Sequence, residues 1–238
     1  MVRSLLLVFC LVGLNECLAQ KEPILIEGKL ETKVSETFNY YLYFPEDYEK
    51  KNQEKFPLLL FLHGGGESGE SLDMMNKNGP PKLIKDGKDF PFLILAPQNP
   101  HKKKWWNTRA VIQLLDSVVA HNRVDVKRIY LTGLSRGGGA VWEMAVQYPS
   151  KFAAMAVVCG MAPLPYANWI NKKLPIWVFH GDQDKVIPIS ESTNMVDKLR
   201  HMGYKVEFTI YEGVGHNSWE NAYDTEELYT WFMKQKQQ

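Results

Sequence analysis

A serine in this sequence stands where its type and its neighbours suit nucleophilic chemistry. Ser135 lies in the segment GLSRG, which matches the pattern G-x-S-x-G through Gly133 and Gly137. Between a buried strand and an amphipathic helix, this pattern is typical of a sharp turn that exposes the serine hydroxyl, and the glycines keep the turn free of clashes. The alternative is a glycine-rich turn with an idle serine. The apolar run before the motif and the amphipathic segment after it favour a nucleophile at Ser135.

A serine hydroxyl is a weak nucleophile and needs a general base. His216 lies in EGVGHNSW, between the last apolar run and the last amphipathic segment. His63 and His180 each end an apolar run and precede a glycine, which favours a role in bracing loops by hydrogen bonds. The other three histidines lie in a basic run or on helical segments: His101, His121 and His201. We therefore expect His216 to be the base.

The imidazole in turn needs a carboxylate that orients it and stabilises its charged form. The segment FHGDQDKVIP supplies Asp182 and Asp184, and the order serine, aspartate, histidine suits a parallel-sheet hydrolase. Asp184 lies further into the loop, from which a side chain can reach the next loop. Asp182 stands beside Gly181 and is better placed to brace the turn. Position alone leaves the two close.

A glycine run explains how a negatively charged oxygen could be stabilised beside this serine. The segment HGGGESGE contains Gly64, Gly65 and Gly66 directly after an apolar run. Backbone N–H groups aimed at the developing oxyanion of an acyl transfer can each lower the barrier by roughly 3–4 kcal/mol. We expect the donors to be the N–H groups of Gly65 and of Arg136, the residue after the serine. A phosphate-binding loop is the alternative, but no G-K-[ST] follows.

Two aromatic segments could contact substrate. Trp105 and Trp106 follow an apolar run in HKKKWWNT and could stack on a sugar ring or an aromatic acyl group. We expect Trp106 to be a pocket wall; the alternative is a solvated basic loop with one tryptophan in the core. Trp219 is either a second wall, which we favour, or the first core residue of the last helix. The three lysines of the segment, 102–104, are expected to be solvated.

The elements that must position these residues alternate along the chain. Short apolar runs without alternation cover residues 56–64, 91–98, 128–135, 152–160, 174–182 and 206–213, as expected of strands buried on both faces. Amphipathic segments cover residues 107–122, 136–148, 190–203 and 219–236. This alternation predicts an α/β fold, with a mostly parallel central sheet flanked by helices. Residues 24–32 and 38–45 are expected to form an antiparallel pair at one edge. The segment 160–174 is too short for a large cap domain.

Composition narrows the function classes. The 238 residues carry a formal net charge of +1, which argues against nucleic acid as a partner. Residues 1–20 have the layout of a secretory signal peptide, which predicts a secreted or periplasmic protein without stable membrane insertion after signal removal. Glu16 before Cys17 argues against a lipoprotein. Cys159 would then be the one remaining cysteine, and its apolar run favours a buried structural role. Residues 21–238 are expected to form a single domain.

Together these motifs resemble the α/β-hydrolase superfamily over nearly the whole mature chain. More narrowly, FLHGGGESG, GPPKLI, APQ, GLSRGGGAVWEMAVQYPSKFAA, HGDQDKVIP and GHNSW resemble small exported esterases described as predicted peptidases or phospholipase/carboxylesterase-like proteins, near feruloyl and acetyl-xylan esterases. The resemblance implies a triad of Ser135, Asp184 and His216, with Gly65 and Arg136 as oxyanion donors. The group often has HGAGERG where this chain has HGGGESG. Substrate inferences from that arginine therefore do not transfer.

These observations predict a serine hydrolase that cleaves carboxylic esters through an acyl-enzyme. The expected substrate is a small-molecule or polysaccharide-linked ester, and the mechanism requires no cofactor or metal. The alternatives are a peptidase of the prolyl-oligopeptidase-like type, a phospholipase or lysophospholipase, and a non-catalytic carbohydrate-binding protein that uses the tryptophan pair.

Overall fold

The structure is a computed structural model that describes residues 36–51 and 53–237. The signal peptide expected at residues 1–20 and the strand expected at residues 24–32 lie outside the described residues. No helix among the described residues has the length and apolar composition needed to cross a bilayer.

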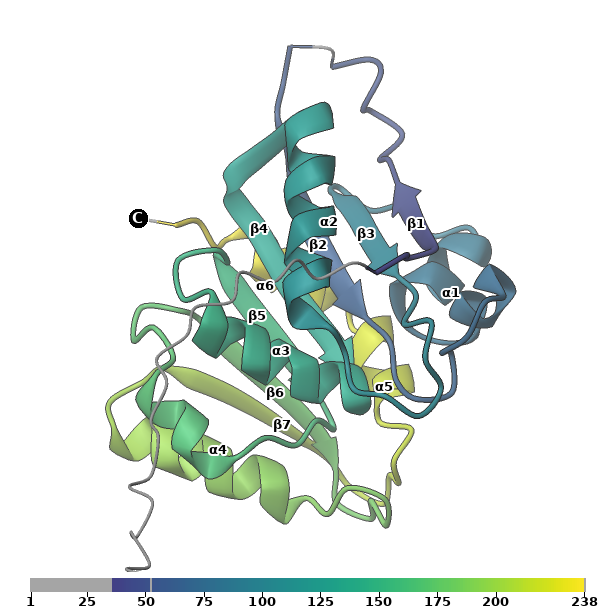
Figure 1. The fold of residues 1–238 in the computed structure, drawn as a ribbon. Helices are drawn as coiled ribbons and strands as arrows, with labels where there is room; N and C mark the ends of the chain where they lie inside the picture. The colour runs from purple at the N-terminus through teal and green to yellow at the C-terminus, as the bar shows by residue number, and fades with distance from the viewer. Residues whose placement is uncertain (1–35, 52, 238) are drawn as a thin grey trace, which may run out of the picture. The chain divides into compact units, whose positions relative to one another are not determined.

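One seven-stranded sheet runs through the described part of the chain (Figure 1). The strand order is β1-β3-β2-β4-β5-β6-β7, in which β1 pairs antiparallel with β3 and every other neighbour is parallel. The mostly parallel sheet predicted from the apolar runs is confirmed. The strands are β1 (Tyr40–Tyr43), β2 (Phe56–Leu62), β3 (Leu93–Pro97), β4 (Val124–Leu134), β5 (Ala154–Val158), β6 (Ile176–Gly181) and β7 (Val206–Tyr211).

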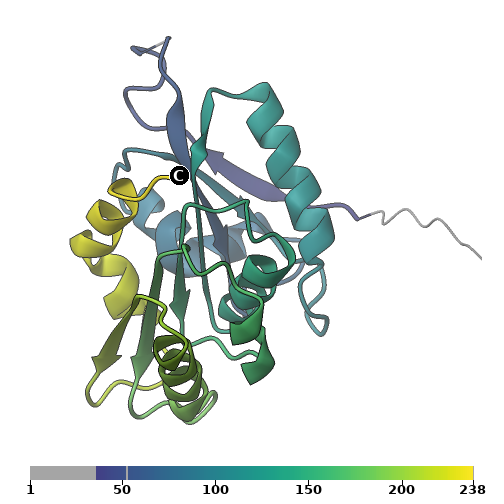
Figure 2. The ribbon, with the colours of Figure 1, turned by 90° about the vertical axis from the view of Figure 1, so that its left-hand side faces the viewer.

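Helices cover both faces of this sheet. In chain order they are the short 3-10 helix η1 (Leu72–Lys77), α1 (Gly79–Lys85), α2 (Thr108–His121), α3 (Arg136–Gln147), the 3-10 helix η2 (Leu164–Asn168), α4 (Ser190–His201), α5 (Trp219–Asp224) and α6 (Glu226–Met233). Helices α2, α3 and α4 pack on one face, and α1, α5 and α6 on the other. Figure 2 shows α5 and α6, in yellow, on the side of the sheet opposite α2 and α3.

Burial on both faces explains why the strands do not alternate in polarity. In β2, Leu58 and Leu60 point into the core beneath α2 and α3, while Leu59 and Phe61 point into the core beneath α5 and α6. All seven residues of β2 are buried. Each such strand gains from the hydrophobic effect on two sides, so its position in the sheet is specified strongly.

Three details differ from the sequence-based expectations. The last amphipathic segment is two helices, because Thr225 has an extended backbone between α5 and α6. Helix α1, which begins with Gly79 and two prolines, was not expected as a helix. The strand expected at residues 38–45 is limited to β1, Tyr40–Tyr43, and it pairs antiparallel with β3.

The register of the sheet brings the important loops to one edge. Leu62, the last residue of β2, lies beside Gly133 of β4, so the loop that begins at His63 runs next to the turn at Ser135. Gly181 at the end of β6 lies beside Tyr211 at the end of β7. Because carboxyl ends of parallel strands face the same edge, the side chains of these loops can converge there.

Candidate active site

The turn between β4 and α3 is strained in the way a nucleophile elbow requires. Ser135 has φ 52° and ψ −120°, and its N–H donates to the carbonyl of Val158 at 2.9 Å. A Cβ on Gly133 would lie 2.6 Å from the carbonyl oxygen of Gly137, and one on Gly137 would lie 2.0 Å from that of Leu62. Only glycine fits at either place, since a side chain would collide with backbone. The close packing presents the serine hydroxyl at the sheet edge.

Ser135, His216 and Asp184 are brought together into one hydrogen-bonded chain. The Ser135 hydroxyl lies 2.9 Å from His216 Nε2, and His216 Nδ1 lies 2.7 Å from Asp184 Oδ2. When the neutral His216 ring carries its proton on Nδ1, that N–H donates a hydrogen bond to Asp184. Nε2 is then free to accept a hydrogen bond from the serine hydroxyl. This arrangement can transfer a proton from the serine during nucleophilic attack.

Asp184 is set up to remain ionised. It is buried, and its Oδ1 accepts from the N–H groups of Val186 at 2.8 Å and Ile187 at 2.9 Å. Burial alone would raise the pKa of Asp184, but the hydrogen bonds from His216, Ile187 and Val186 together lower it below its ordinary value. A second imidazole, that of His180, places its Nε2 3.2 Å from Asp184 Oδ2. The carboxylate is therefore surrounded by groups that favour its charged form.

The structure separates the two aspartates that position alone had left close. Asp182 Oδ1 accepts from the N–H of Gly213 at 2.8 Å, so this residue braces the turn after β7. His180 also braces a loop: its Nδ1 lies 2.7 Å from the Ser192 hydroxyl and its Nε2 lies 2.9 Å from the carbonyl of Ile187. His63 does the same after β2, where its Nε2 accepts from the N–H of Asn99 at 2.9 Å. The loop-bracing roles expected for both histidines are confirmed.

The glycine run lies against the elbow, but the closest approach is made by Gly64. A Cβ there would lie 2.7 Å from Leu134 Cδ1 and 3.4 Å from Ser135 Cβ. At Gly65 the nearest atom would be Arg136 Cζ at 4.0 Å. The steric need for glycine is therefore greater at Gly64 than at Gly65, the expected oxyanion donor. Among the described residues, no carbonyl or side chain accepts from the N–H of Gly65 or of Arg136, so both groups are free to bind an oxyanion.

The Arg136 side chain joins two loops that flank the serine. Its Nη1 donates to the carbonyls of Lys102 and Lys104, both at 3.0 Å, and its Nη2 donates to the hydroxyl of Ser68. Burial lowers the pKa of Arg136, and the nearby charge of Glu67 opposes this effect. The guanidinium stays charged at neutral pH because the ordinary pKa of an arginine side chain lies far above 7. It ties the glycine-rich loop to the loop after β3.

A second chain of contacts runs from a buried carboxylate to His216. Glu67 is only 2% exposed and its Oε1 accepts from Asn78 Nδ2 at 2.6 Å. Asn78 Oδ1 accepts from Trp219 Nε1 at 2.9 Å, and the Trp219 ring packs edge-on against the His216 ring, with centroids 5.2 Å apart. Trp219 thus lies beside the histidine, as a wall residue should. Glu67 and Asn78 were missed from sequence, since nothing local marks them as partners.

The assignment of Trp106 to a pocket wall is wrong. Trp106 is 4% exposed, packs in the core, and donates from Nε1 to the carbonyl of His63 at 3.3 Å. Trp105 is the exposed member of the pair, at 44%. The chain enters α2 at Asn107, and the residue before it turns inward beneath the loop after β2. Burial of that large ring outweighs any role at the surface.

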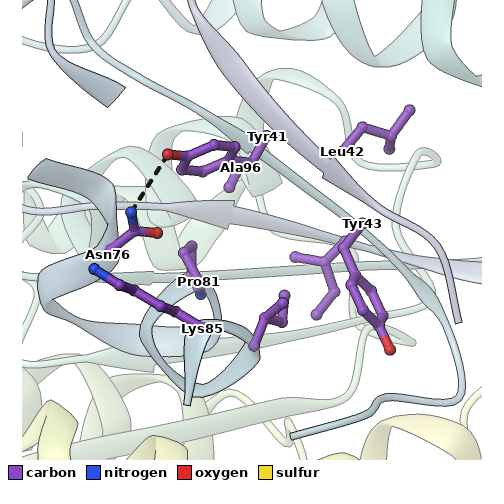
Figure 3. A pocket seen from close by; sticks show the side chains of 9 residues that line it. Tyr41, Leu42, Tyr43, Asn76, Pro81, Lys85 and Ala96 are labelled. Carbon is purple, nitrogen blue, oxygen red and sulfur yellow. Dashed lines mark hydrogen bonds between the residues drawn. The ribbon is translucent and has the colours of Figure 1, made fainter. Parts of the chain in front are cut away.

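Two cavities are lined by residues that belong to the loops and helices around the site. A cavity of about 700 Å³ is lined by the glycine-rich loop and the loop after β3, with Gly65, Ser68, Glu70, Met74 and Lys102 among its walls. A second, of about 440 Å³, lies between α1 and α5 and includes Asn78 and Trp219. A more apolar pocket of about 300 Å³ lies between β1, β3 and α1, where Asn76 Nδ2 donates to the Tyr41 hydroxyl (Figure 3). None of its lining residues belongs to the serine site.

One group of metal-type ligands occurs in the described part of the chain, and it overlaps the serine site. Ligand atoms of Cys159, Asp184 and His216 all lie within 4.8 Å of one another. Burial raises the pKa of the Cys159 thiol to about 12, so at neutral pH it is protonated and a poor metal ligand. Asp184 and His216 are already paired with each other. This geometry suits proton transfer better than metal binding. Cys159 is buried, as predicted from the apolar run in which it lies.

A family model described as phospholipase/carboxylesterase matches residues 94–227, which is more than half of the chain. The chain belongs to the phospholipase/carboxylesterase family. This match includes the elbow, Asp184 and His216, and it confirms the resemblance to α/β-hydrolase esterases.

Several individual proteins are similar to this phospholipase/carboxylesterase family member. A probable feruloyl esterase C of Aspergillus terreus is 27% identical over 184 residues, covering 75% of this chain and 66% of that protein. An acyl-protein thioesterase 1 of Neurospora crassa is 31% identical over 102 residues, covering 40% of this chain and 42% of that protein. The solved structure of a thermostable esterase has a TM-score of 0.72 at 31% identity, over 83% of this chain and 59% of that one. The chain spans half or less of the length of several curated relatives that it matches.

Proposed function

We propose that this protein is an exported serine hydrolase that cleaves carboxylic esters through an acyl-enzyme on Ser135, with carbohydrate-linked esters as its substrates. The observation that carries the proposal is the continuous chain from the Ser135 hydroxyl through the His216 ring to Asp184, at 2.9 and 2.7 Å. Membership of the phospholipase/carboxylesterase family supports the ester chemistry. Similarity to feruloyl and acetylxylan esterases supports the carbohydrate link.

The proposed reaction has two halves. His216 Nε2 takes the hydroxyl proton as Ser135 Oγ attacks the ester carbonyl, and the N–H groups of Gly65 and Arg136 bind the oxyanion. The tetrahedral intermediate collapses, the imidazolium gives its proton to the departing alkoxide, and an alcohol leaves. Water then attacks the acyl-enzyme with His216 as base again, and the carboxylic acid is released. Ionised Asp184 stabilises the imidazolium in both halves.

The cavity beside the oxyanion loop suits a polar leaving group. Its walls include the side chains of Ser68, Glu70, Ser71 and Lys102, which can form hydrogen bonds with hydroxyl groups, and the thioether of Met74. Because the cavity also borders Gly65, an alcohol held there would lie next to the proposed oxyanion site. A sugar alcohol fits this mixture of polar and apolar walls.

Replacement of Ser135 by alanine tests the proposal. We expect hydrolysis of p-nitrophenyl acetate to fall by about 10⁴-fold or more, because the nucleophile is lost. A fluorophosphonate probe should label the wild type and leave Ser135→Ala unlabelled. The matched control is Ser117→Ala, on the exposed side of α2, which should be labelled like the wild type. Retention of most of the activity in a folded Ser135→Ala protein would refute the mechanism, and an unlabelled wild type would favour a non-catalytic binding protein.

Thioester hydrolysis is a second candidate, favoured by similarity to acyl-protein thioesterases or their homologs from three organisms. It uses the same residues, and only the leaving group differs. A panel of acetylated xylo-oligosaccharide, methyl ferulate, a palmitoyl thioester and a lysophospholipid separates the candidates. The largest kcat/KM on the oligosaccharide or the ferulate supports our proposal; the largest on the thioester or lysolipid overturns the substrate class.

Export is the remaining part of the proposal and rests on residues 1–20 of the sequence. Mass spectrometry of protein expressed with its own N-terminus tests it. The expected product is a chain that begins after cleavage near Ala19 or Gln20, recovered outside the cytoplasm. An intact N-terminus on cytoplasmic protein would contradict export.

A further inference from the structure

The exposed indole of Trp105 lies on the helix that begins at the nucleophile. A Cβ added to Gly139 of α3 would lie 2.6 Å from Trp105 Cζ2 and 2.8 Å from the carbonyl oxygen of Met161. The N–H of Gly139 donates to the carbonyl of Ser135, one helical turn earlier. One turn advances the axis by about 5–6 Å, so the indole lies within the reach of a substrate bonded to Ser135.

Hydrogen bonds hold this exposed ring in one orientation. Trp105 Nε1 donates to Glu143 Oε2 at 3.1 Å. The other oxygen of Glu143 accepts from the Thr108 hydroxyl and from Gln147 Nε2, both at 2.8 Å. A carboxylate that accepts from three donors has little conformational freedom. The Trp105 indole that it binds is therefore fixed, although Trp105 is 44% exposed.

The loop that carries Trp105 is fixed as well. Arg136 donates to the carbonyl of Lys104, and the buried Asn99 side chain donates to the carbonyl of Trp105 at 3.4 Å. A ring that is already ordered loses little entropy when a ligand stacks on it, which is the advantage of a preorganised binding surface. A tryptophan that served only to cover the core would not need this arrangement, since Trp106 next to it performs that task.

The surroundings of Trp105 indicate what kind of ring it would bind. Met161 is 45% exposed and its carbonyl oxygen lies against the same Gly139, while Glu143 provides a polar edge through its hydrogen bond with Trp105 Nε1. Sites for small apolar ligands enclose most of the ligand surface. An open indole with a polar rim instead offers one face, which suits a ring whose other face and hydroxyl groups remain in water. A pyranose or furanose ring of a polysaccharide has these properties.

We infer that Trp105 is a sugar-binding platform that holds the carbohydrate part of an ester substrate while the acyl carbon of the ester lies at Ser135. The inference rests on the proposed function and names the substrate class of that same site. The same loop continues through Lys102 into the cavity beside Gly65, so carbohydrate on the platform can extend toward the oxyanion loop.

The test compares Trp105→Ala with Trp169→Ala on acetylated xylo-oligosaccharide and on p-nitrophenyl acetate. Trp169 is a matched control, because it is 59% exposed and follows η2, where Asn171 bonds to Pro149 beyond the far end of α3. For Trp105→Ala we expect the ratio of kcat/KM on the oligosaccharide to kcat/KM on p-nitrophenyl acetate to fall by about 3- to 10-fold. The fall should come mainly from a higher KM. Trp105→Phe should keep part of the preference, and Trp169→Ala should keep all of it.

The other outcomes overturn either the inference or the proposed function on which it rests. An equal loss on both substrates indicates a structural role for Trp105. A selective loss on methyl ferulate alone assigns the platform to an aromatic acyl group. Binding of unesterified xylohexaose to the wild type and to Trp105→Ala, measured by calorimetry, separates the platform from the chemistry. If the wild type shows no catalysis but binds xylohexaose in a way that depends on Trp105, the proposed function is rejected and the platform is retained. If xylohexaose binding does not depend on Trp105, the platform is rejected.

Discussion

Acidification should destabilise this protein through His63. The ring is fully buried, its Nδ1 lies 2.6 Å from the carbonyl of Gly64, and its Nε2 accepts from the N–H of Asn99. Both nitrogens are satisfied only in the neutral ring with a proton on Nδ1. Burial, reinforced by the charge of Arg136, lowers the pKa of His63 to about 4, against the hydrogen bond to Gly64, which favours the charged form.

The sign and size of the effect follow from the two pKa values. In the unfolded chain the pKa of His63 returns to its ordinary value of 6.5, so between pH 6.5 and about 4 the unfolded state binds more protons than the native state. The free energy of unfolding therefore falls as the pH is lowered through this window. The difference between 6.5 and about 4, at about 1.4 kcal/mol per pH unit, amounts to about 3 kcal/mol.

The contribution of Asp184 has the same sign but belongs to a lower window. Because its pKa is lowered in the native state, its stabilising contribution is present above its ordinary value of 3.8 and is lost as the pH falls through the native pKa. Asp184 therefore contributes little to the change in stability between pH 7.5 and 4.5, and comparison of the wild type with a His63 variant isolates the contribution of His63.

Urea unfolding followed by tryptophan fluorescence at pH 7.5, 6.5, 5.5 and 4.5 provides the assay. Wild type should lose most of the 3 kcal/mol by pH 4.5, whereas His63→Gln should lose much less over the same range. His201→Gln, an exposed position at the end of α4, is the matched control and should follow the wild type. His63→Asn serves if the glutamine variant does not fold. Wild-type and His63 variants with the same pH dependence would refute the reasoning.

Three further predictions concern the supports of the site. Gly137→Ala should destabilise the fold by about 3 kcal/mol or prevent folding, because its Cβ would lie 2.0 Å from the Leu62 carbonyl oxygen. Gly66→Ala is the control and should be tolerated, because there is open space around Gly66. Equal melting temperatures for the two variants would contradict this prediction. Arg136→Met should lower kcat on p-nitrophenyl acetate by about tenfold, because the contacts between the two loops are lost. Arg136→Lys should not restore kcat, since one ammonium group cannot reach both loops. A lysine variant with full wild-type kcat would refute this prediction. Asn78→Ala should cost about 2–3 kcal/mol in urea unfolding because it leaves a buried carboxylate without its donor, and an unchanged free energy of unfolding would argue against that role.

Local patterns in the sequence predicted those parts of the site that depend on local geometry. The elbow follows from glycines two residues on either side of Ser135, and the apolar run before it places the turn at the end of a strand. His216 could be selected because it alone among the histidines stands in a loop between the last strand and the last helices. The parallel sheet followed in the same way from runs that are apolar on both faces.

The parts that could not be predicted depend on contacts between distant segments. Trp105 and Trp106 are neighbours with the same chemistry, and only the path of the loop decides which one turns inward. Glu67 and Asn78 became visible only once α1 lay against the glycine-rich loop. The choice between the two aspartates rested partly on family resemblance, because the hydrogen bonds that distinguish them come from backbone groups further along the chain.

The guanidinium of Arg136 has a consequence for how relatives of this protein can diverge. It donates hydrogen bonds to three acceptors that belong to two different loops. The residue that carries it directly follows the nucleophile. Loops of a different length, taken from another member of the family, would lack these acceptors. The guanidinium would then be partly buried without hydrogen-bond partners. Diversification of specificity here should therefore proceed by exchanging both loops together with the amino acid after the serine, as one inherited module.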